Sequence, residues 1–525
     1  MNIDALTAYL ALSSGSYSGI LRDMYAVHNL GLNPDLHTKL LANRFVGGTK
    51  ELSGTPPLSF KSKGKPLTAW SITGNTVQNG TPTPDTPQEV KAVGDRTGNL
   101  FNLQSWTNTT TDTRSYFQLS ITLYNGSTSL GECRFDVHET GRVALTSATA
   151  GADGATRLAI KHNGSTRDLA IGSVYDDFPA NQPLTISFDV SGYDPTITGG
   201  ISISNIMLNS GSTPLPYEPY GYKIPVVTRG KNLIDVANVT GNTNTLFTDN
   251  VNPKLAQVKF DEATQYTISM KFEIDTRLGW RKITFTYTDG TTSVSPWIST
   301  SGVFKYTSTS GKTIAKVEFT NYNYYGGVSV EYIQLEAGTE ATEYEPYHEP
   351  ITTPIYLDSP LYKIGDYADS INYAEQKVER VVKELVLTGK ENWYYMPNYD
   401  VENTVRIHSS EILPDRKGTM LDLCSHFERM DYRSLNVSNK PAFSIASGTQ
   451  LVFRVSKAEG SAVTYFKSYL AAQYAAGTPV KVYYVMQTPE TESVTLPEIP
   501  TLNGTTVIDV DTVVKPESMT IKYRR

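Results

Sequence analysis

A pair of short motifs occurs twice in this chain and constrains its architecture more than any other sequence feature. The first copy opens at Gly98-Asn99-Leu100-Phe101 and closes at Tyr217-Glu218-Pro219-Tyr220. The second opens at Lys231-Asn232-Leu233-Ile234 and closes at Tyr344-Glu345-Pro346-Tyr347, at almost the same separation. Internal repetition fixes an architecture before other signals are weighed. The motifs therefore predict two modules of similar size in tandem.

Length and composition indicate a multidomain, globular protein that is rich in β-structure. At 525 residues the chain is too long for one hydrophobic core. Charged residues make up 19% and hydrophobic residues 39%, which is typical of a folded protein with a polar surface. The 33 tyrosines suit half-exposed strand positions and recognition surfaces, because each joins an apolar ring to a polar tip.

Several classes of protein are disfavoured by charge and cysteine content. The net charge is −7 and no basic block is present, so we expect no binding to nucleic acid. No run of about 18 apolar residues predicts a transmembrane helix, and the N-terminus does not resemble a signal peptide. The two cysteines, Cys133 and Cys424, lie far apart and indicate neither a disulfide framework nor a metal site. We expect synthesis in a reducing cytosol.

The N-terminal region, residues 1–57, is predicted to be a short helical segment. Apolar residues recur at helical spacing, and Asn33-Pro34 is a good start for a helix that ends before Gly47-Gly48. The pattern predicts three short helices within residues 1–47, and three helices of this length make a poor core on their own. They are expected to mediate attachment or oligomerisation, or alternatively to cap the next domain.

The rest of the chain predicts a mostly β fold that ends in a domain of mixed type. Many short apolar stretches are separated by Gly, Asn and Asp turns, which favours jelly-roll or other β-sandwich modules. One clear helix is predicted from Ser461 to Ala476, with Val463, Phe466, Leu470 and Tyr474 on one face. The predicted organisation after the N-terminal segment is a β-hairpin and Pro-rich connector at 58–97, β-sandwich module 1 at 98–222, β-sandwich module 2 at 223–347, a connector at 348–383, an α+β domain at 384–489 and a C-terminal β tail at 490–525.

No motif in the sequence predicts an enzyme, a cofactor or a metal site. Gly311-Lys312-Thr313 lacks the earlier glycine of a P-loop, since Tyr306 occupies that position. The histidines are scattered and show no zinc pattern. Cys424-Ser425-His426 is the only close Cys/His pair, and a packed core cysteine explains it better than a nucleophile does. We expect no catalytic residues.

Aromatic residues of module 2 are the best candidates for a carbohydrate-binding site. They are Trp280, Trp297, Tyr322, Tyr324 and Tyr325. Flat rings stack on the apolar faces of sugars, while Asn, Asp and Ser bind the hydroxyl groups. Two alternatives remain open: each tryptophan could be a core residue of its sandwich, or the aromatic residues could form an interface between subunits.

Several stretches resemble tail-associated structural proteins of phages and prophages of Gram-positive bacteria. Residues 70–84, the Gly-Asn-Leu-Phe opening at Gly98, and the stretches 386–393 and 480–489 are similar to segments of those proteins. Residues 333–342 resemble the closing strand of their carbohydrate-binding-module-like jelly rolls. The resemblance covers about 58–525. Module 1 departs from it, with Met207-Leu208-Asn209-Ser210-Gly211 in place of Leu-Glu-x-Gly.

The resemblance implies a virion protein, assembled in the host cytoplasm, that acts at the host cell surface. It implies a tail fibre or baseplate receptor-binding protein that contacts host surface polysaccharide. The N-terminal helices would bind other virion proteins, and the chain would form a homotrimer whose weak sugar contacts add up through avidity. The alternatives are a purely architectural tail or head fibre or decoration protein, and a polysaccharide-degrading spike.

Overall fold

The computed structural model describes most of the chain beyond residue 48. The described stretches are 49–99, 218–234, 260–274, 280–298, 300–322, 328–413, 415–446, 448–458 and 460–524, and within module 1 only the strands named below. The helices predicted within residues 1–47 therefore lie outside the described residues.

The described chain is mostly β, in antiparallel sheets, as the sequence predicted. Two of these sheets form what we call the central scaffold. The larger has the strand order β1 (Thr49–Gly54), β34 (Ser518–Arg524), β3 (Leu67–Thr73), β25 (Ser370–Asn372), β26 (Lys377–Leu387), β32 (Val480–Ser493) and β29 (Leu423–Cys424). The smaller has the order β2 (Leu58–Lys61), β33 (Thr505–Val510), β15 (Tyr222–Arg229) and β22 (Ile351–Leu357), with β6 (Asp95–Arg96) also paired to β15.

The two sheets of the scaffold share one hydrophobic core. In β34 every second side chain is buried, which gives Met519, Ile521 and Tyr523 to this core. The opposite sheet supplies residues such as Ile224 and Ile508, which are fully buried. Each such aliphatic side chain stabilises the fold by about 1.5–3 kcal/mol. This two-residue alternation is what one buried face of each sheet requires.

Both ends of the described chain lie inside the scaffold. Strand β34 pairs with β1 on one side and β3 on the other, while β33 pairs with β2 and β15. The predicted organisation instead took 58–97 as a β-hairpin and Pro-rich connector, 348–383 as a connector and 490–525 as a separate C-terminal β tail. Residues 49–54, which were grouped with the helical segment, form an edge strand. These stretches are short, and only pairing between distant strands makes them one domain.

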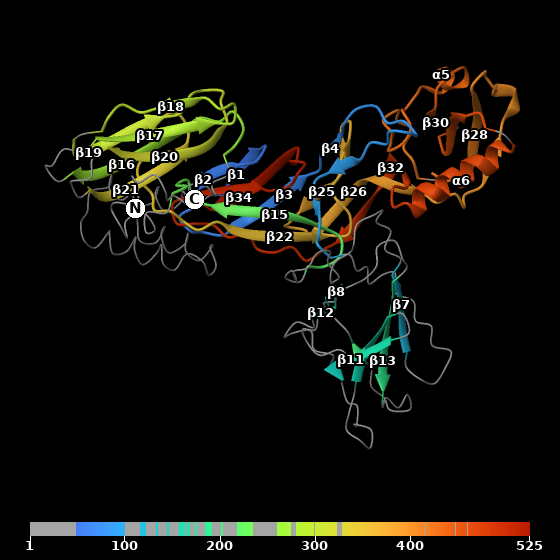
Figure 1. Ribbon diagram of the computed structural model, residues 1–525, viewed down its shortest axis with the longest axis horizontal. Coiled ribbons are helices and arrows are strands. Elements are labelled where there is room, and N and C mark those ends of the chain that lie inside the picture. The colour runs from blue at the N-terminus through green and yellow to red at the C-terminus, as the bar shows by residue number, and fades with distance from the viewer. Residues whose placement is uncertain are drawn as a thin grey trace, which may run out of the picture.

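Three segments are inserted into the scaffold, each between two strands that pair with each other. Module 1 lies between β6 and β15, where Arg96 pairs with Tyr222. Module 2 lies between β15 and β22. Residues 388–479, which we call the C-terminal insert, lie between β26 and β32, where Leu387 pairs with Val480. The modules follow one another in sequence, and each leaves and re-enters the same scaffold (Figure 1).

Module 2 consists of two three-stranded antiparallel sheets around a separate core. Four of its strands overlap the stretches 266–272, 283–287, 314–319 and 328–335, whose residue patterns predict strands. The sheets are β19 (Gly302–Thr307), β16 (Tyr266–Ile274) and β21 (Val328–Ala337), and β18 (Thr292–Val294), β17 (Trp280–Tyr287) and β20 (Ile314–Tyr322).

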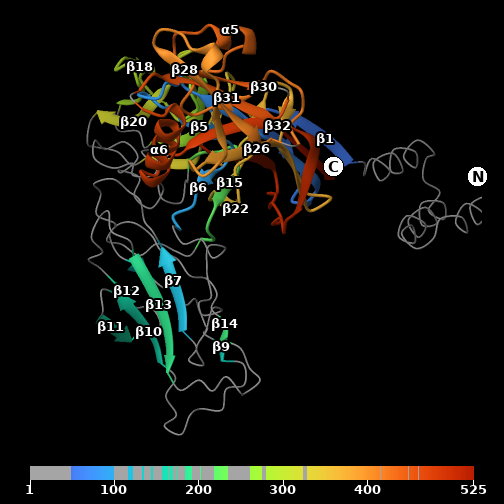
Figure 2. The ribbon, with the colours of Figure 1, turned by 90° about the vertical axis from the view of Figure 1, so that its right-hand side faces the viewer.

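Module 1 is described by its strands alone. Figure 2 shows them extending away from the scaffold. They are β7 (Tyr116–Ile121), β8 (Cys133–Arg134), β9 (Ala144–Leu145), β10 (Arg157–His162), β11 (Ser165–Asp168), β12 (Val174–Tyr175), β13 (Leu184–Ser191) and β14 (Ile201–Ser202). The largest sheet has the order β11-β10-β13-β7.

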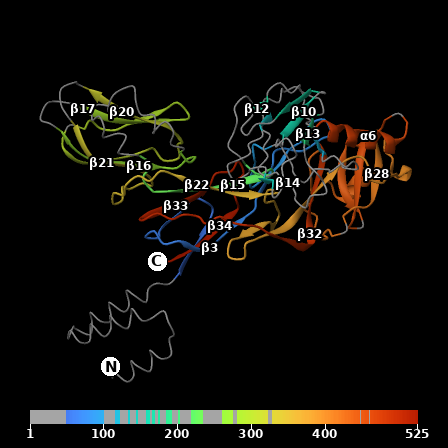
Figure 3. The same cartoon turned by 90° about the horizontal axis from the view of Figure 1, so that it is seen from below.

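The C-terminal insert packs a helix against a four-stranded sheet at the opposite end of the scaffold from module 2 (Figures 1 and 3). Aromatic rings fill the space between them: Trp393 and Phe466 lie edge to face at 4.9 Å, and Phe453 lies 5.1 Å from Phe466. The sheet has the order β27 (Trp393–Tyr395), β28 (Thr404–Glu411), β31 (Gln450–Ser456) and β30 (Ala442–Ala446), and the insert also holds η3 (Pro397–Tyr399), α5 (Tyr432–Asn436) and α6 (Ala462–Ala475).

Helix α6 matches the prediction closely in its bounds and less closely in its buried face. Ser461 is the N-cap, and its side chain accepts a hydrogen bond from the Thr464 amide. Phe466 and Leu470 are fully buried, as predicted, but Tyr474 is 49% exposed. The apolar face therefore ends one turn before the helix does.

Strands β26 and β32 run between the scaffold and the insert, and β26 contributes side chains to the hydrophobic cores of both. Val378 of β26 belongs to the scaffold core, while Leu387 at its other end belongs to the core of the insert. Between them, Val382 packs with Val485 of β32 in a third cluster, which includes two residues of β5 (Val90–Ala92). The remaining short strands nearby are β4 (Thr76–Gln78), which pairs with β5, and β23 (Lys363–Ile364), which pairs with β24 (Tyr367–Ala368).

A buried carboxylate holds an irregularity in this long hairpin. The register of β26 against β32 shifts between Arg380 and Val382. The Asp369 carboxylate accepts hydrogen bonds from the backbone amides of Val381, Val382 and Tyr362, at 2.7 to 3.0 Å. Arg380, whose guanidinium lies 3.7 Å from the same carboxylate, donates to the carbonyl of Pro360 at 2.8 Å. One side chain thus accepts hydrogen bonds from two β26 amides at the irregularity.

We expect Asp369→Ala to destabilise the protein by about 3–5 kcal/mol, because it leaves three buried backbone amides without an acceptor and removes one of the two carboxylates beside Arg380, the other being Glu492 at 3.2 Å. The measurement is the free energy of unfolding from urea titration, with Asp366→Ala as the control. Asp366 is exposed and only three residues away, so its removal should cost no more than about 0.5 kcal/mol. Equal effects of the two substitutions would contradict the assigned role of Asp369.

Candidate functional site

The aromatic residues predicted to bind carbohydrate belong to one sheet of module 2 as far as they are described. Trp280 opens β17 and pairs directly with Tyr322 at the end of β20. Trp297 follows β18, the third strand of the same sheet, and is 39% exposed. Tyr324 and Tyr325 lie outside the described residues. The structure therefore brings the backbones of Trp280 and Tyr322 together and places Trp297 on the surface.

The outer face of this sheet combines an aromatic ring with polar side chains. Ile283 and Phe285 point into the core and are fully buried, so the alternating Lys282 and Thr284 face outward. The ammonium group of Lys282 lies 4.0 Å from the centroid of the Trp297 ring, which places this ring on the outer face as well. A flat ring beside an amine and threonine hydroxyls is a surface on which a sugar can stack and form hydrogen bonds.

The repeated motifs lie at the necks of modules 1 and 2 and make equivalent contacts there. The Asn99 side-chain amide donates to the backbone carbonyl of Glu218 at 2.9 Å. In module 2, the Asn232 amide donates to the backbone carbonyl of Glu345 at 3.2 Å. In each case the asparagine of the opening motif binds the glutamate of the closing motif. The repeated motifs therefore hold the first and last residues of each inserted module together.

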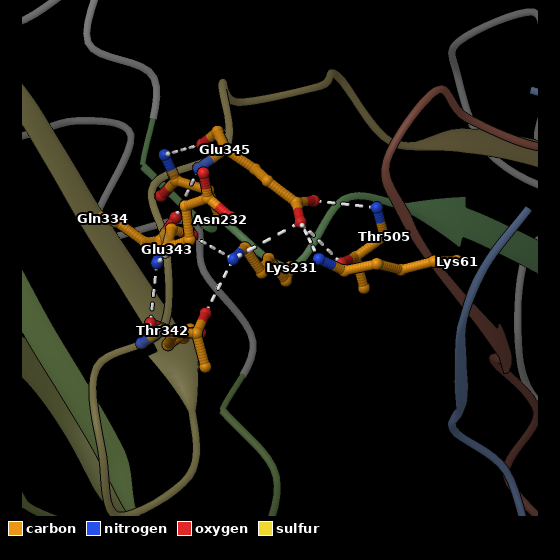
Figure 4. A network of polar contacts seen from close by, with 9 residues as sticks. Lys61, Lys231, Asn232, Gln334, Thr342, Glu343, Glu345 and Thr505 are labelled. Carbon is orange, nitrogen blue, oxygen red and sulfur yellow. Dashed lines mark hydrogen bonds and ion pairs between the residues drawn. The ribbon is translucent and has the colours of Figure 1, made fainter. Parts of the chain in front are cut away.

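The glutamate carboxylates then tie each neck to neighbouring segments. Glu218 accepts from the Gly98 amide at 2.9 Å and pairs with Lys223 of β15. Glu345 accepts from the backbone amide of Thr505 at 2.7 Å and from its hydroxyl at 2.9 Å, which connects module 2 to β33 (Figure 4). We call this second set of contacts the module 2 neck clamp.

Two lysines complete the module 2 neck clamp. Lys61 of β2 and Lys231 each place an ammonium nitrogen 3.4 Å from the same oxygen of Glu345. Burial raises the pKa of the Glu345 carboxyl, but the hydrogen bonds from Thr505 and the charge of Lys231 outweigh burial and hold that pKa below its ordinary value. The carboxylate is therefore ionised at neutral pH and joins the module to the scaffold.

A cavity of about 630 Å³ lies between the scaffold and the C-terminal insert, and no sequence motif pointed to it. Six lining residues carry the chemistry used below: Arg96, Tyr222, Tyr362, His426, Lys481 and Tyr483. They come from separate stretches of the chain, so their proximity is a property of the fold. Ser425 and His426 of the Cys424-Ser425-His426 stretch line the cavity, while Cys424 is buried, as predicted, and burial raises its pKa to about 12.

Comparisons with known proteins do not assign a family to this chain. Protein-family models, curated proteins and solved structures were all searched, and none of them gave a match. Within the described stretches, no three His, Cys, Asp or Glu residues are grouped so that they could hold a metal ion. In the same stretches, no helix has the length and apolar character needed to cross a membrane.

We expect the stabilising effect of Glu345 to disappear in acid. A carboxyl with a lowered pKa contributes stability above its unfolded-state pKa, and this contribution is lost as the pH falls through the folded-state pKa. Glu345→Gln should therefore lower the free energy of unfolding by about 1–3 kcal/mol at neutral pH and by much less below about pH 4. Urea titration at several pH values measures the difference.

Glu343→Gln is the matched control for this experiment. Glu343 is exposed and contributes only its backbone carbonyl to the neck, as an acceptor for Lys231. Removal of its charge should have little effect at any pH. A loss of stability in Glu345→Gln that is the same at neutral and acid pH would contradict an ionic role for the clamp.

Proposed function

We propose that this chain is a structural protein of a phage virion, a tail fibre or baseplate receptor-binding protein that contacts host surface polysaccharide. The observation that carries the proposal is the arrangement of three inserts on one scaffold closed by both ends of the described chain. Such an arrangement holds binding modules apart while fixing each through two adjacent strands. It suits a protein whose task is to present surfaces to a large partner.

We assign modules 1 and 2 to the jelly-roll type of β-sandwich and the C-terminal insert to the α+β class. Two antiparallel sheets around one core in module 2, and α6 packed on a four-stranded sheet in the insert, support these assignments. The equivalent necks support a common origin for the two modules.

Within module 2, we assign polysaccharide binding to the outer face of the sheet β18-β17-β20. Trp297 would stack on a sugar ring, and Lys282 would bind its oxygen atoms. Trp280 and Tyr322 pair through their backbones in β17 and β20 of the same sheet, and Tyr324 and Tyr325 follow Tyr322 closely in the sequence. Module 1 is the weaker candidate for sugar binding because its closing motif departs from the pattern in module 2.

Attachment to the virion is assigned to the segment that precedes β1. Strand β1 forms the edge of the larger scaffold sheet, and most of its residues are exposed. The described chain therefore begins at an edge strand, which leaves this end of the sheet accessible to other virion proteins. A homotrimer built through this segment would multiply weak sugar contacts by avidity.

Trp297→Ala in the full chain should weaken binding to the recognised polysaccharide by about two- to tenfold per site, the equivalent of a stacking contact of about 0.5–1.5 kcal/mol. The measurement is binding of the purified protein to a panel of cell-wall polysaccharides from Gram-positive bacteria. Tyr474→Ala, which removes an aromatic ring that is 49% exposed on α6, is the matched control. If a folded, unmodified chain bound no polysaccharide of the panel, a purely architectural role in the virion would replace this proposal.

A further inference from the structure

Two hydrogen-bond donors line the cavity between the scaffold and the C-terminal insert and have fewer acceptors than their N–H groups can bind. They are Arg96 and His426. Arg96 forms no ion pair among the described residues. Its guanidinium instead lies 4.6 Å from the ring centroid of Tyr222 and 5.7 Å from that of Tyr220, and it donates to the Tyr220 hydroxyl at 3.3 Å. The two rings hold the cation in position without neutralising its charge.

His426 supplies a second donor. Its side chain is buried, and its Nε2 atom has no partner that meets hydrogen-bond geometry within the part of the chain that the structure describes. The Gln473 side chain is a polar neighbour of this imidazole, but its Oε1 atom accepts from the Thr478 hydroxyl at 2.9 Å. Its Nδ1 atom lies 2.8 Å from the Ser425 hydroxyl, which accepts from the Lys481 amide at 2.9 Å. That hydroxyl has one proton to give, and Pro479 O is farther away at 3.5 Å. We therefore assign the Ser425 proton to Nδ1, which leaves Nε2 protonated and in need of an acceptor.

Two other polar residues that line the cavity, Tyr362 and Lys481, bind the carboxylate of Glu384. Tyr362 donates its hydroxyl proton to Glu384 at 2.9 Å, and Lys481 pairs with the other oxygen of Glu384 at 2.9 Å. Burial raises the pKa of Tyr362 and of Tyr483 well above the ordinary value, so both rings stay neutral. The Glu384 carboxylate is thus occupied by protein donors. Two further carboxylates line the cavity: Glu89 lies 3.5 Å from the ammonium group of Lys91, and Asp95 accepts from the Val513 amide at 3.1 Å. A ligand would meet the Arg96 cation, the imidazole N–H and the aromatic rings beside these two paired acids.

We propose that this cavity binds an acidic sugar, with the anionic group on Arg96, a ring oxygen or hydroxyl on His426 Nε2, and the sugar ring against Tyr222. Its volume lies within the usual range of small-molecule sites, about 300–1,000 Å³. A buried donor without a partner is costly, and an oxygen-rich ligand would satisfy it. The carboxylate of a uronic acid and the phosphate of a sugar phosphate share this chemistry. The choice of a saccharide rests on the function proposed above, whereas the need for an anionic, oxygen-rich ligand does not.

The test uses isothermal titration calorimetry on the full chain with four probes. These are a galacturonic acid disaccharide, the corresponding neutral galactose disaccharide, galactose 6-phosphate and inorganic phosphate. The proposal expects saturable binding of at least one acidic sugar, at least about tenfold tighter than binding of the neutral disaccharide, because one charge-assisted hydrogen bond accounts for a factor of that size. The uronate and phosphosugar arms identify the anionic group.

Three substitutions test whether the binding occurs in the cavity. Arg96→Gln should weaken it about tenfold or more, and because Arg96 is exposed the variant should fold normally, which circular dichroism verifies. Arg433→Gln, at an exposed arginine of α5 outside the cavity lining, should leave binding unchanged. Trp297→Ala should also leave it unchanged, so failure of this site and failure of the module 2 site are distinguishable.

Three results would overturn the proposal. They are no saturable binding of either acidic sugar, equal binding of the neutral and acidic disaccharides, and binding that Arg96→Gln does not change. Inorganic phosphate that binds as tightly as galactose 6-phosphate, with no binding of the uronate, would reduce the site to an anion site and overturn its assignment to a saccharide.

Discussion

The pairing of the two ends of the described chain within the central scaffold is the interaction on which the rest of the structure depends. Strand β34 lies between β1 and β3, and the hydroxyl of Ser518 reaches that of Thr73, which is 445 residues away in sequence. Met519 and Ile521 of β34 are fully buried in the core that both sheets share. Without the last two strands, β3 and β15 would each lose a neighbour, and the strands that anchor the inserts would lose their packing surface.

This constraint also explains why the same motif occurs twice. An insert placed between two paired strands must leave and return within one strand spacing, about 4.8 Å. Its first and last residues are therefore forced together, and polar backbone groups at the neck must find partners. In both modules, an asparagine side chain donates a hydrogen bond to the backbone carbonyl of a glutamate at the other end of the insert. In module 2 the Glu345 carboxylate also binds Thr505, Lys61 and Lys231. A repeat that marks the boundaries of modules need not mark their binding sites.

The sequence predicted those features that depend on local patterns. Helix α6, with its Ser461 cap, and four strands of module 2 follow from residue spacing. The scaffold was missed because its strands are two to fourteen residues long and pair across hundreds of residues, so connectors and a tail were predicted where one domain exists. The cavity was missed for the same reason: Arg96, His426 and Lys481 are adjacent only after those pairings have formed.

The measurement that tests this account most directly is native-state hydrogen exchange of the full chain, read by mass spectrometry as denaturant is raised. If the scaffold is one domain closed by the chain's ends, the amides of β3, β15 and β34 should become exchangeable together, in a single cooperative step. The strands of module 2 should open in a step of their own. Exchange of β33 and β34 at low denaturant, while β3 and β15 stay protected, would contradict a scaffold that depends on both ends of the chain.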